Sequence, residues 1–185
     1  MDDREIAARI WTIGHSTHEL DSFVALLRSQ RIDLLADVRT VPKSRRMPWF
    51  WGEALAGSLP QEGIAYRHFP DLGGFRRPQA GSPNGGWRVA AFQGYADYMD
   101  SVAFRNALRQ LEAEAEGGKR VAVMCAESDW RRCHRRLISD ALVARGYEVL
   151  HIRARGGVER HVLTPFAVVD GDRLQYPPEQ TTLEV

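Results

Sequence analysis

The chain has 185 residues, 44% of them hydrophobic, and a formal net charge of +1 at pH 7, so we expect one domain, residues 1–185, with a full core and no linker. The near-neutral charge excludes a global field that would draw the protein onto nucleic acid or an anionic membrane. The charged N-terminus, a longest apolar run of only residues 121–126 and two cysteines argue against a leader, a membrane span and a disulfide scaffold, so we expect a cytoplasmic protein with reduced thiols and no membrane partner.

The spacing of apolar residues predicts strands that alternate with helices along most of the chain. Ser16 and Glu19 have the spacing of a capping box, which indicates where the first helix begins. Residues 70–87 are rich in glycine and proline and have the length of a lid or a binding loop. In chain order, the expected elements are strand 10–13, a helix from the Ser16 cap to Ser29, strand 34–38, helix 50–59, strand 64–68, helix 91–99, helix 102–116, strand 121–125, helix 130–145, strand 148–152 and a terminal hairpin over 168–174.

This order of elements predicts an α/β fold: a single Rossmann-like domain with a mostly parallel sheet, helices on both faces and a small C-terminal β-hairpin. The carboxyl ends of parallel strands share one edge of the sheet, which is where ligands bind in such folds. We therefore expect the polar residues at the strand ends to open toward one crevice. They are Gly14-His15-Ser16, Asp37 with Arg39, Tyr66 with His68, and Cys125 with Glu127.

Five short motifs follow one another in a fixed order from residue 10 to about residue 168. They are Thr12-Ile13-Gly14-His15-Ser16, Asp37-Val38-Arg39, Leu72-Gly73-Gly74, Tyr95-Ala96-Asp97-Tyr98-Met99, and Cys125-Ala126-Glu127 followed by Cys133-His134-Arg135. In this order they resemble the domain of unknown function 488 family. The resemblance implies a single-domain bacterial or archaeal α/β protein that shares these residues. It implies no agreed activity, substrate or cofactor, and some relatives are loosely linked to DNA repair.

The first functional hypothesis is an enzyme that binds a small phosphorylated or nucleotide-like ligand in the crevice. Helix N-termini after Ser16 and after Glu127 would offer free N–H groups, and arginines would add guanidinium forks to the anion. The catalytic candidates are Asp37 or Glu127 as general base, His15 as a second acid/base group, and Cys125 as a structural thiol or nucleophile. The ligand-binding candidates are Ser16, Arg39, Tyr66, Cys133, His134 and Arg135. The structural alternative is that Ser16 only caps a helix, His15 and His134 only satisfy backbone groups, and the arginines form a solvated face.

A narrower version of this hypothesis is a cysteine phosphatase, because Cys125 and Arg131 have C-x5-R spacing. The intervening residues include two carboxylates, Glu127 and Asp129, and no glycine. Like charge repels a phosphate dianion and raises the pKa of a neighbouring thiol. The phosphatase interpretation is therefore disfavoured.

A second hypothesis is a zinc- or iron-dependent enzyme. Its credible ligands are Cys125, Cys133, His134, His15, Asp37 and Glu127. On the expected helix, however, Cys133 and His134 are neighbours, and their side chains would diverge by about 100°. His134 also falls in an apolar stripe, which is typical of a core histidine. The sequence therefore assigns no metal ligand and no cofactor.

A third hypothesis is a nucleic-acid-associated, DNA repair-linked binding protein without catalysis. In residues 43–51, Lys43, Arg45 and Arg46 stand beside Trp49, Phe50 and Trp51, and this mixture can hold a phosphate backbone and stack a base. The structural alternative is that Trp49 and Phe50 pack the loop onto the sheet. The sequence favours the small-ligand enzyme, leaves the question of catalysis open, and carries no signal for the oligomeric state.

Overall fold

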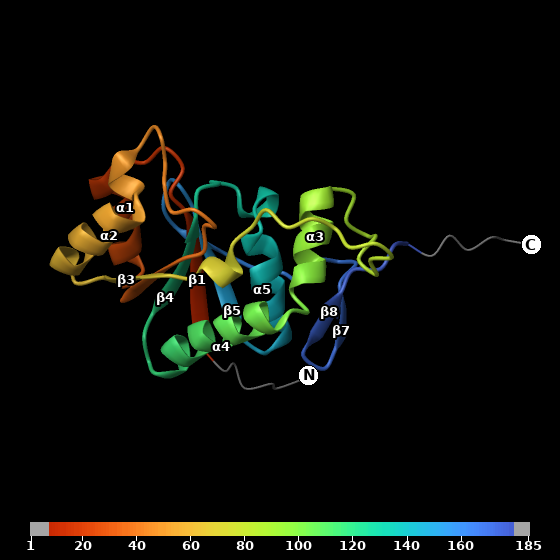
Figure 1. Ribbon diagram of the computed structural model, residues 1–185. Coiled ribbons are helices and arrows are strands. Elements are labelled where there is room, and N and C mark those ends of the chain that lie inside the picture. Colours follow the sequence, from red (N-terminus) through yellow and green to blue (C-terminus); the bar gives the residue numbers. More distant parts are fainter. Residues whose placement is uncertain (1–7, 180–185) are drawn as a thin grey trace, which may run out of the picture.

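A six-stranded sheet with helices on both faces forms the centre of the computed structural model, which describes residues 8–179 (Figure 1). The strand order is β3-β2-β4-β1-β5-β6, with β6 antiparallel to β5 and the other neighbours parallel. The α/β fold is confirmed, but the Rossmann-like part of the prediction is not, because that fold has the order 3-2-1-4-5-6. The strands are β1 (Arg9–Gly14), β2 (Leu34–Asp37), β3 (Ala65–His68), β4 (Val121–Cys125), β5 (Glu148–Ile152) and β6 (Val158–Arg160).

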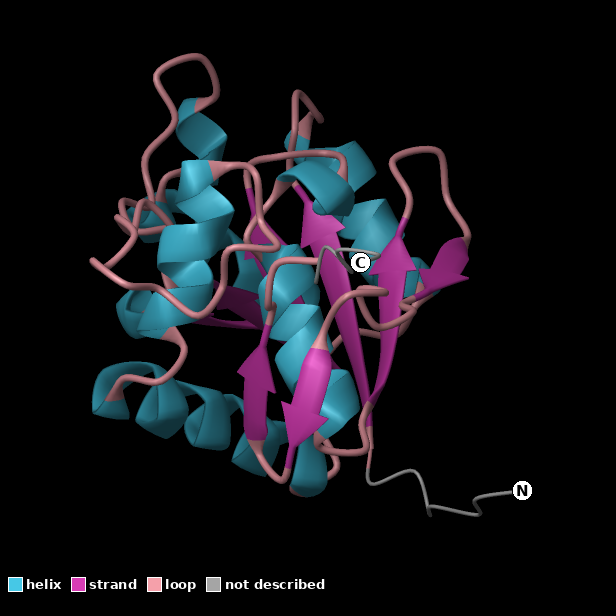
Figure 2. Ribbon diagram, turned by 90° about the vertical axis from the view of Figure 1, so that its right-hand side faces the viewer, coloured by secondary structure: helices cyan, strands magenta, loops and turns pink. Residues whose placement is uncertain are grey.

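Helices cover the two faces of the sheet unequally. One face carries α1 (Leu20–Ser29) and α2 (Gly52–Ser58), and the other carries α3 (Ala90–Tyr98), α4 (Val102–Glu116) and α5 (Arg135–Ala144). The predicted hairpin is present as β7 (Val168–Asp170) and β8 (Arg173–Gln175), and it lies against α5 (Figure 2). Within residues 8–179, no helix has both the length and the apolar character that a membrane crossing requires.

The alternation of side chains along the strands produces two hydrophobic cores, one on each face of the sheet. Leu35 of β2 packs into the core beneath α1 and α2. Ala36 pairs with Val123 of β4, and both belong to the core beneath α3, α4 and α5. Asp37 therefore points to the α1–α2 face, whereas Cys125, two residues after Val123, points to the α3–α5 face. Two strand ends that meet at one edge thus carry their polar side chains on opposite faces.

Two predicted helix starts are wrong. The first helix begins at Leu20 with Glu19 as its N-cap, because Ser16 adopts a left-handed backbone (φ 46°) in the preceding turn. The helix expected from residue 130 begins at Arg135, because Trp130–Arg132 form a separate 3-10 turn. The Ser16 side chain therefore does not cap α1, and the residues just before Arg135 lie outside the helix.

Candidate functional site

A cavity of about 650 Å³ opens at the carboxyl ends of β1, β2 and β4. We call it the crevice. Among the predicted site residues, it is lined by Ser16, Arg39, Cys125, Glu127, Cys133 and His134. The others, His15, Asp37, Tyr66 and Arg135, do not line it. The structure therefore separates the predicted residues into a set that faces the crevice and a set that lies behind its wall.

Asp37 and Arg39 form a buried ion pair at the end of β2. Asp37 is fully buried and Arg39 is 5% exposed. Arg39 Nη2 lies 2.5 Å from Asp37 Oδ2, Arg39 Nε donates to Oδ1 at 2.9 Å, and the Tyr66 hydroxyl donates to Oδ2 at 2.7 Å. Burial would lower the pKa of Arg39, but the hydrogen bonds and charge of Asp37 raise it. Both oxygens of Asp37 thus hold Arg39 in place.

Tyr66 acts as a neutral donor in this pair. Burial, followed by the charge of Asp37, raises the pKa of the Tyr66 phenol. The phenol therefore keeps its proton at neutral pH and donates it to Asp37 Oδ2. In this position Tyr66 fixes the carboxylate of Asp37, and it does not line the crevice.

His15 lies between Arg39 and the aromatic ring of Phe50. Its Nδ1–H donates to the Ser16 carbonyl at 3.0 Å, its Nε2 accepts from Arg39 Nη1 at 3.3 Å, and its ring stacks on Phe50 at 4.4 Å. Burial, with a further contribution from the Arg39 charge, lowers the pKa of His15 to about 4. His15 is therefore neutral near pH 7, and the lone pair of its Nε2 faces Arg39.

The backbone after β1 is fastened to the backbone after β4. The His15 and Ser16 N–H groups donate to the Cys125 and Ala126 carbonyls, each at 2.9 Å. Gly14 allows this approach, because a Cβ on it would lie 2.0 Å from the Glu127 carbonyl oxygen. These N–H groups are consequently occupied and are not available to a bound anion.

Two thiols and an imidazole form the floor of the crevice. The Sγ atoms of Cys125 and Cys133 and one ring nitrogen of His134 all lie within 4.8 Å of one another, and we call this group the thiol–imidazole cluster. Cys133 Sγ lies 3.7 Å from His134 Nδ1. The expected divergence of Cys133 and His134 is wrong, because Cys133 has an extended backbone (φ −123°, ψ 149°) ahead of α5. The two side chains converge instead.

Hydrogen bonds polarise the thiol–imidazole cluster. His134 Nε2–H donates to the Val38 carbonyl at 3.0 Å, which turns Nδ1 toward the sulfur atoms. The neighbouring Cys125 thiol, followed by His134 and the charge of Arg135, places the pKa of Cys133 well below its usual range. The neighbouring Cys133 sulfur, together with burial, raises the pKa of Cys125. Cys133 is therefore the more acidic of the two thiols.

Arg135 supports this cluster from behind. It is 1% exposed, donates through Nε to Cys133 Sγ at 3.4 Å, and also donates to the Glu127 carbonyl. The sequence predicts Arg135 as a ligand-binding residue. Its place behind the wall makes it a positioning group for the Cys133 sulfur and for the loop that carries Glu127.

A buried polar chain that the sequence did not indicate leads away from Arg135. Asp140 Oδ1 accepts from His161 Nε2–H at 2.8 Å, so His161 Nδ1 accepts from His151 Nε2–H at 2.9 Å. His151 Nδ1 then accepts from the Thr12 hydroxyl at 2.7 Å, and Arg135 Nη1 donates to the same oxygen at 3.3 Å. Burial, followed by the neighbouring His161 imidazole, lowers the pKa of His151 to about 2. No local sequence pattern indicates this chain, because Thr12 and His151 become neighbours only through the pairing of β1 with β5 in the sheet.

One wall of the crevice is apolar and carries an unusual aromatic residue. Phe75 is 93% exposed and has a positive φ of 59°, a conformation that favours glycine. Phe92 and Tyr95 of α3 line the same cavity. Strained residues that other contacts hold in place are concentrated at functional sites. Burial in a core therefore does not explain why a phenylalanine occupies this strained position at the mouth of the crevice.

The segment 43–51 contributes one side chain to the crevice and buries most of its aromatic surface. Phe50 is fully buried in the core beneath α1 and α2, and Trp49 packs there too while its Nε1–H donates to the His18 carbonyl at 3.0 Å. The structural alternative for Trp49 and Phe50 is therefore confirmed. Lys43 lines the crevice and lies over the ring of Trp51, which is 40% exposed.

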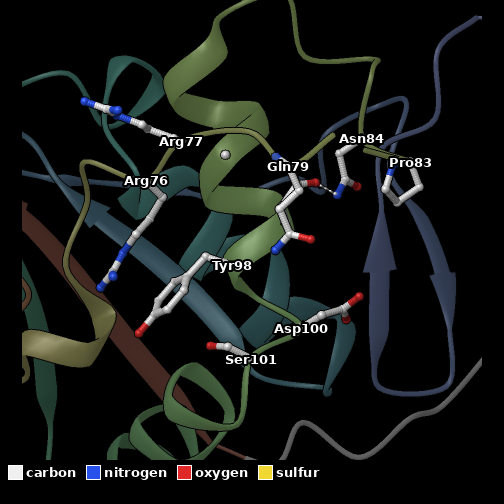
Figure 3. Close-up of a pocket in the computed structure, with 10 residues that line it drawn as sticks. Arg76, Arg77, Gln79, Pro83, Asn84, Tyr98, Asp100 and Ser101 are labelled. Carbon is white, nitrogen blue, oxygen red and sulfur yellow. Dashed lines mark hydrogen bonds between the residues drawn. The ribbon is translucent and has the colours of Figure 1, made fainter. Parts of the chain in front are cut away.

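A second cavity, of about 340 Å³, lies between α3 and the glycine-rich loop (Figure 3). Its buried Asp97 accepts hydrogen bonds from the Gln79 N–H at 2.8 Å and from Asn84 Nδ2 at 2.7 Å. Arg76 lies on the ring of Tyr98 at 3.6 Å from its centroid. These contacts fix the loop on α3, so that the preceding residues Gly74 and Phe75 form a wall of the crevice.

Comparison with known proteins supports the resemblance seen in the motifs. A family model described as "Domain of unknown function DUF488" matches residues 19–142. The matched stretch contains the crevice residues from Arg39 to His134. No curated protein and no solved structure matches the chain.

Proposed function

The chain belongs to the DUF488 family, whose description names no reaction, and from the site itself we propose that it is an enzyme that binds a small phosphorylated, nucleotide-like ligand in the crevice. The observation that carries this proposal is the contrast between two sides of one cavity. Arg39, Lys43 and Arg132 contribute positive charge, while Phe75 and Phe92 contribute aromatic surface. A ligand with an anionic group and a planar apolar group satisfies both sides.

Arg39 is the main anion-binding group in this proposal. Its guanidinium is oriented before any ligand arrives, because Asp37 holds two of its nitrogens. Preorganised charge binds an anion with little loss of side-chain entropy. Lys43 and Arg132 are exposed and add charge at the mouth. Asp37, Tyr66 and His15 then serve as positioning residues for Arg39.

The chemical step takes place between the ligand and the floor of the crevice. Glu127 is exposed and lines the cavity, which suits a general base. Cys125 and Cys133 present sulfur to the same space, with His134 beside them. Ser16 lines the rim and is able to donate its hydroxyl to a bound anion.

Replacement of Phe75 by glycine is expected to weaken ligand binding without weakening the fold. Loss of a base–aromatic stack removes about 1–3 kcal/mol, or roughly a 5- to 150-fold loss of affinity for AMP. The free energy of unfolding should stay within about 1 kcal/mol, because relief of the left-handed strain at Phe75 offsets the entropy lost by glycine. Intrinsic tryptophan fluorescence would report AMP binding, and urea denaturation would report stability.

Val162→Ala is the matched control, because Val162 is also exposed (76%) but does not line the crevice. It should leave AMP affinity unchanged. Failure of AMP, GMP, CMP and UMP all to show saturable binding at millimolar concentration would overturn the proposal. Tight binding of a single-stranded oligonucleotide in that same experiment would support the nucleic-acid-binding hypothesis instead.

A further inference from the structure

We propose that Cys125, Cys133 and His134 bind one divalent ion of the zinc class, with a fourth coordination position open toward the crevice. Thiolate and imidazole are the ligands that zinc prefers, and three protein ligands with one open position are typical of catalytic zinc. Binding of the ion depends only on this cluster. Its catalytic use rests on the function proposed above, because the ligand would have to reach the open position.

The distances in the cluster fit a tetrahedral ion. Zn–S bonds of about 2.3 Å and Zn–N bonds of about 2.0 Å place two sulfur ligands about 3.8 Å apart, and sulfur about 3.6 Å from nitrogen. Cys133 Sγ and His134 Nδ1 are 3.7 Å apart, and all three ligand atoms lie within 4.8 Å of one another. Only small side-chain movements are needed to coordinate one ion.

The surroundings of the cluster fix the ligand atoms in the required orientation. His134 donates Nε2–H to the Val38 carbonyl, which leaves Nδ1 as the coordinating nitrogen. A metal-bound histidine almost always donates its second ring N–H to a carbonyl or a carboxylate in this way. Arg135 donates Nε–H to Cys133 Sγ, which stabilises a thiolate. These two bonds orient the cluster before an ion binds.

Gly74 leaves room at the coordinating nitrogen. A Cβ at this position would lie 3.0 Å from His134 Nδ1. The Gly74 carbonyl accepts from the Thr40 hydroxyl at 3.1 Å, so the backbone is held in this position. Gly74 does not have a positive φ, and its lack of a side chain is therefore explained by the space beside His134 rather than by backbone conformation.

An ion in this cluster would act as a Lewis acid on the ligand. Both sulfur atoms and His134 line the crevice, so the open position faces the same space as Arg39. A divalent ion there polarises a phosphoryl or carbonyl oxygen, or lowers the pKa of a bound water. Each protonated thiol releases its proton to solvent when the ion binds, and the two resulting thiolates neutralise the charge of the ion.

Cobalt(II) titration of the chelator-treated full chain under a non-thiol reductant tests this site. A tetrahedral thiolate complex gives visible d–d bands and a near-ultraviolet sulfur-to-cobalt charge-transfer band. We expect both to saturate at one ion per chain and to disappear when Zn²⁺ is added. Cys133→Ser and Cys125→Ser should each lose at least 100-fold in affinity and lose charge-transfer intensity, and His134→Gln should lose at least 10-fold.

Gly74→Ala keeps every ligand and is the decisive variant, because it only fills the space beside His134 Nδ1. We expect a loss of about 10- to 100-fold in cobalt affinity, the range that supporting residues of metal sites show. Gly85→Ala, whose Cβ would make only ordinary contacts from 3.6 Å, and His18→Gln, outside the cluster, should bind cobalt as the parent does. Circular dichroism would confirm that the variants are folded.

The absence of a charge-transfer band in the parent protein at millimolar cobalt would overturn the metal site. Equal affinities of the parent and Cys133→Ser would overturn it as well. Because AMP binding is measured separately by fluorescence, the two proposals fail separately. Cobalt binding without AMP binding removes the proposed function alone, and AMP binding without cobalt binding removes the metal site alone.

Discussion

Arg39→Met is expected to lower the free energy of unfolding by about 3–5 kcal/mol, as removal of one partner from a buried ion pair usually does. Methionine retains most of the apolar length of arginine but removes the charge. The fully buried Asp37 would then keep the Tyr66 hydroxyl and the backbone N–H of residue 39 as its hydrogen-bond donors. Urea denaturation of the parent and of the variant would measure the difference.

A double-mutant cycle separates the charge effect from the loss of packing. Asp37→Asn in the Arg39→Met background should recover at least 2 kcal/mol, about the size expected for directly contacting charged groups. If Arg39→Met lowers the free energy of unfolding by less than about 1 kcal/mol, the pair does not hold the wall of the crevice as described. Loss of activity in an Asp37 or Arg39 variant therefore indicates a role in catalysis only when the variant has been shown to remain folded.

Gly14→Ala is expected to be the most damaging change of a single small residue, with a loss of about 3 kcal/mol or more. Its Cβ would lie 2.0 Å from the Glu127 carbonyl oxygen and 2.8 Å from the Ser128 Cα. These are backbone atoms, so relief requires the loops after β1 and β4 to separate. That movement would break the backbone hydrogen bonds from His15 and Ser16.

Gly57→Ala is the matched control, because a Cβ at this position in α2 would have no atom within 4 Å. Alanine in a helix is favoured over glycine by up to about 1 kcal/mol, so this variant should be as stable as the parent or slightly more so. Thermal unfolding of the two variants side by side gives the comparison. A Gly14→Ala protein with the stability of Gly57→Ala would contradict the close approach of the two loops.

Local sequence patterns predict β1 to β5, the terminal hairpin, the coverage of both faces and a cavity at the strand ends, and the structure has all of these. The short edge strand β6 was not predicted. What the patterns do not contain is which strands are neighbours and in which register. Asp37 and Cys125 both end a strand, and only the pairing of Ala36 with Val123 shows that they point to opposite faces. Successive side chains of a strand alternate between the two faces, so the register of β2 and β4 places the predicted site residues Asp37 and Cys125 on different faces of the sheet.

The start of α5 shows a second reason why the sequence did not predict the arrangement of the site. An arginine-rich run with apolar spacing is typical of a helix, but Asp129 accepts from the Arg131 N–H and begins a separate 3-10 turn over Trp130–Arg132. A short side chain that bonds to nearby backbone competes with the α-helix. This local competition leaves Cys133 extended, and it is the reason why Cys133 and His134 converge. The buried hydrogen-bond chain from Asp140 through His161 to His151 is indicated even less by local sequence patterns. Its three members come from separate segments: α5, the residue after β6, and β5.

Protection of the cysteines from alkylation by a bound nucleotide tests the central claim most directly, because the only two cysteines of the chain lie on the floor of the crevice. The rate of iodoacetamide reaction at Cys125 and Cys133 would be followed by peptide mass spectrometry in chelator, with and without AMP. The account predicts at least tenfold slower alkylation at saturating AMP, and weaker protection in Phe75→Gly at that same AMP concentration, as its lower AMP affinity requires. An unchanged rate in the parent protein while AMP is bound would show that the ligand does not occupy the crevice, and would contradict the account.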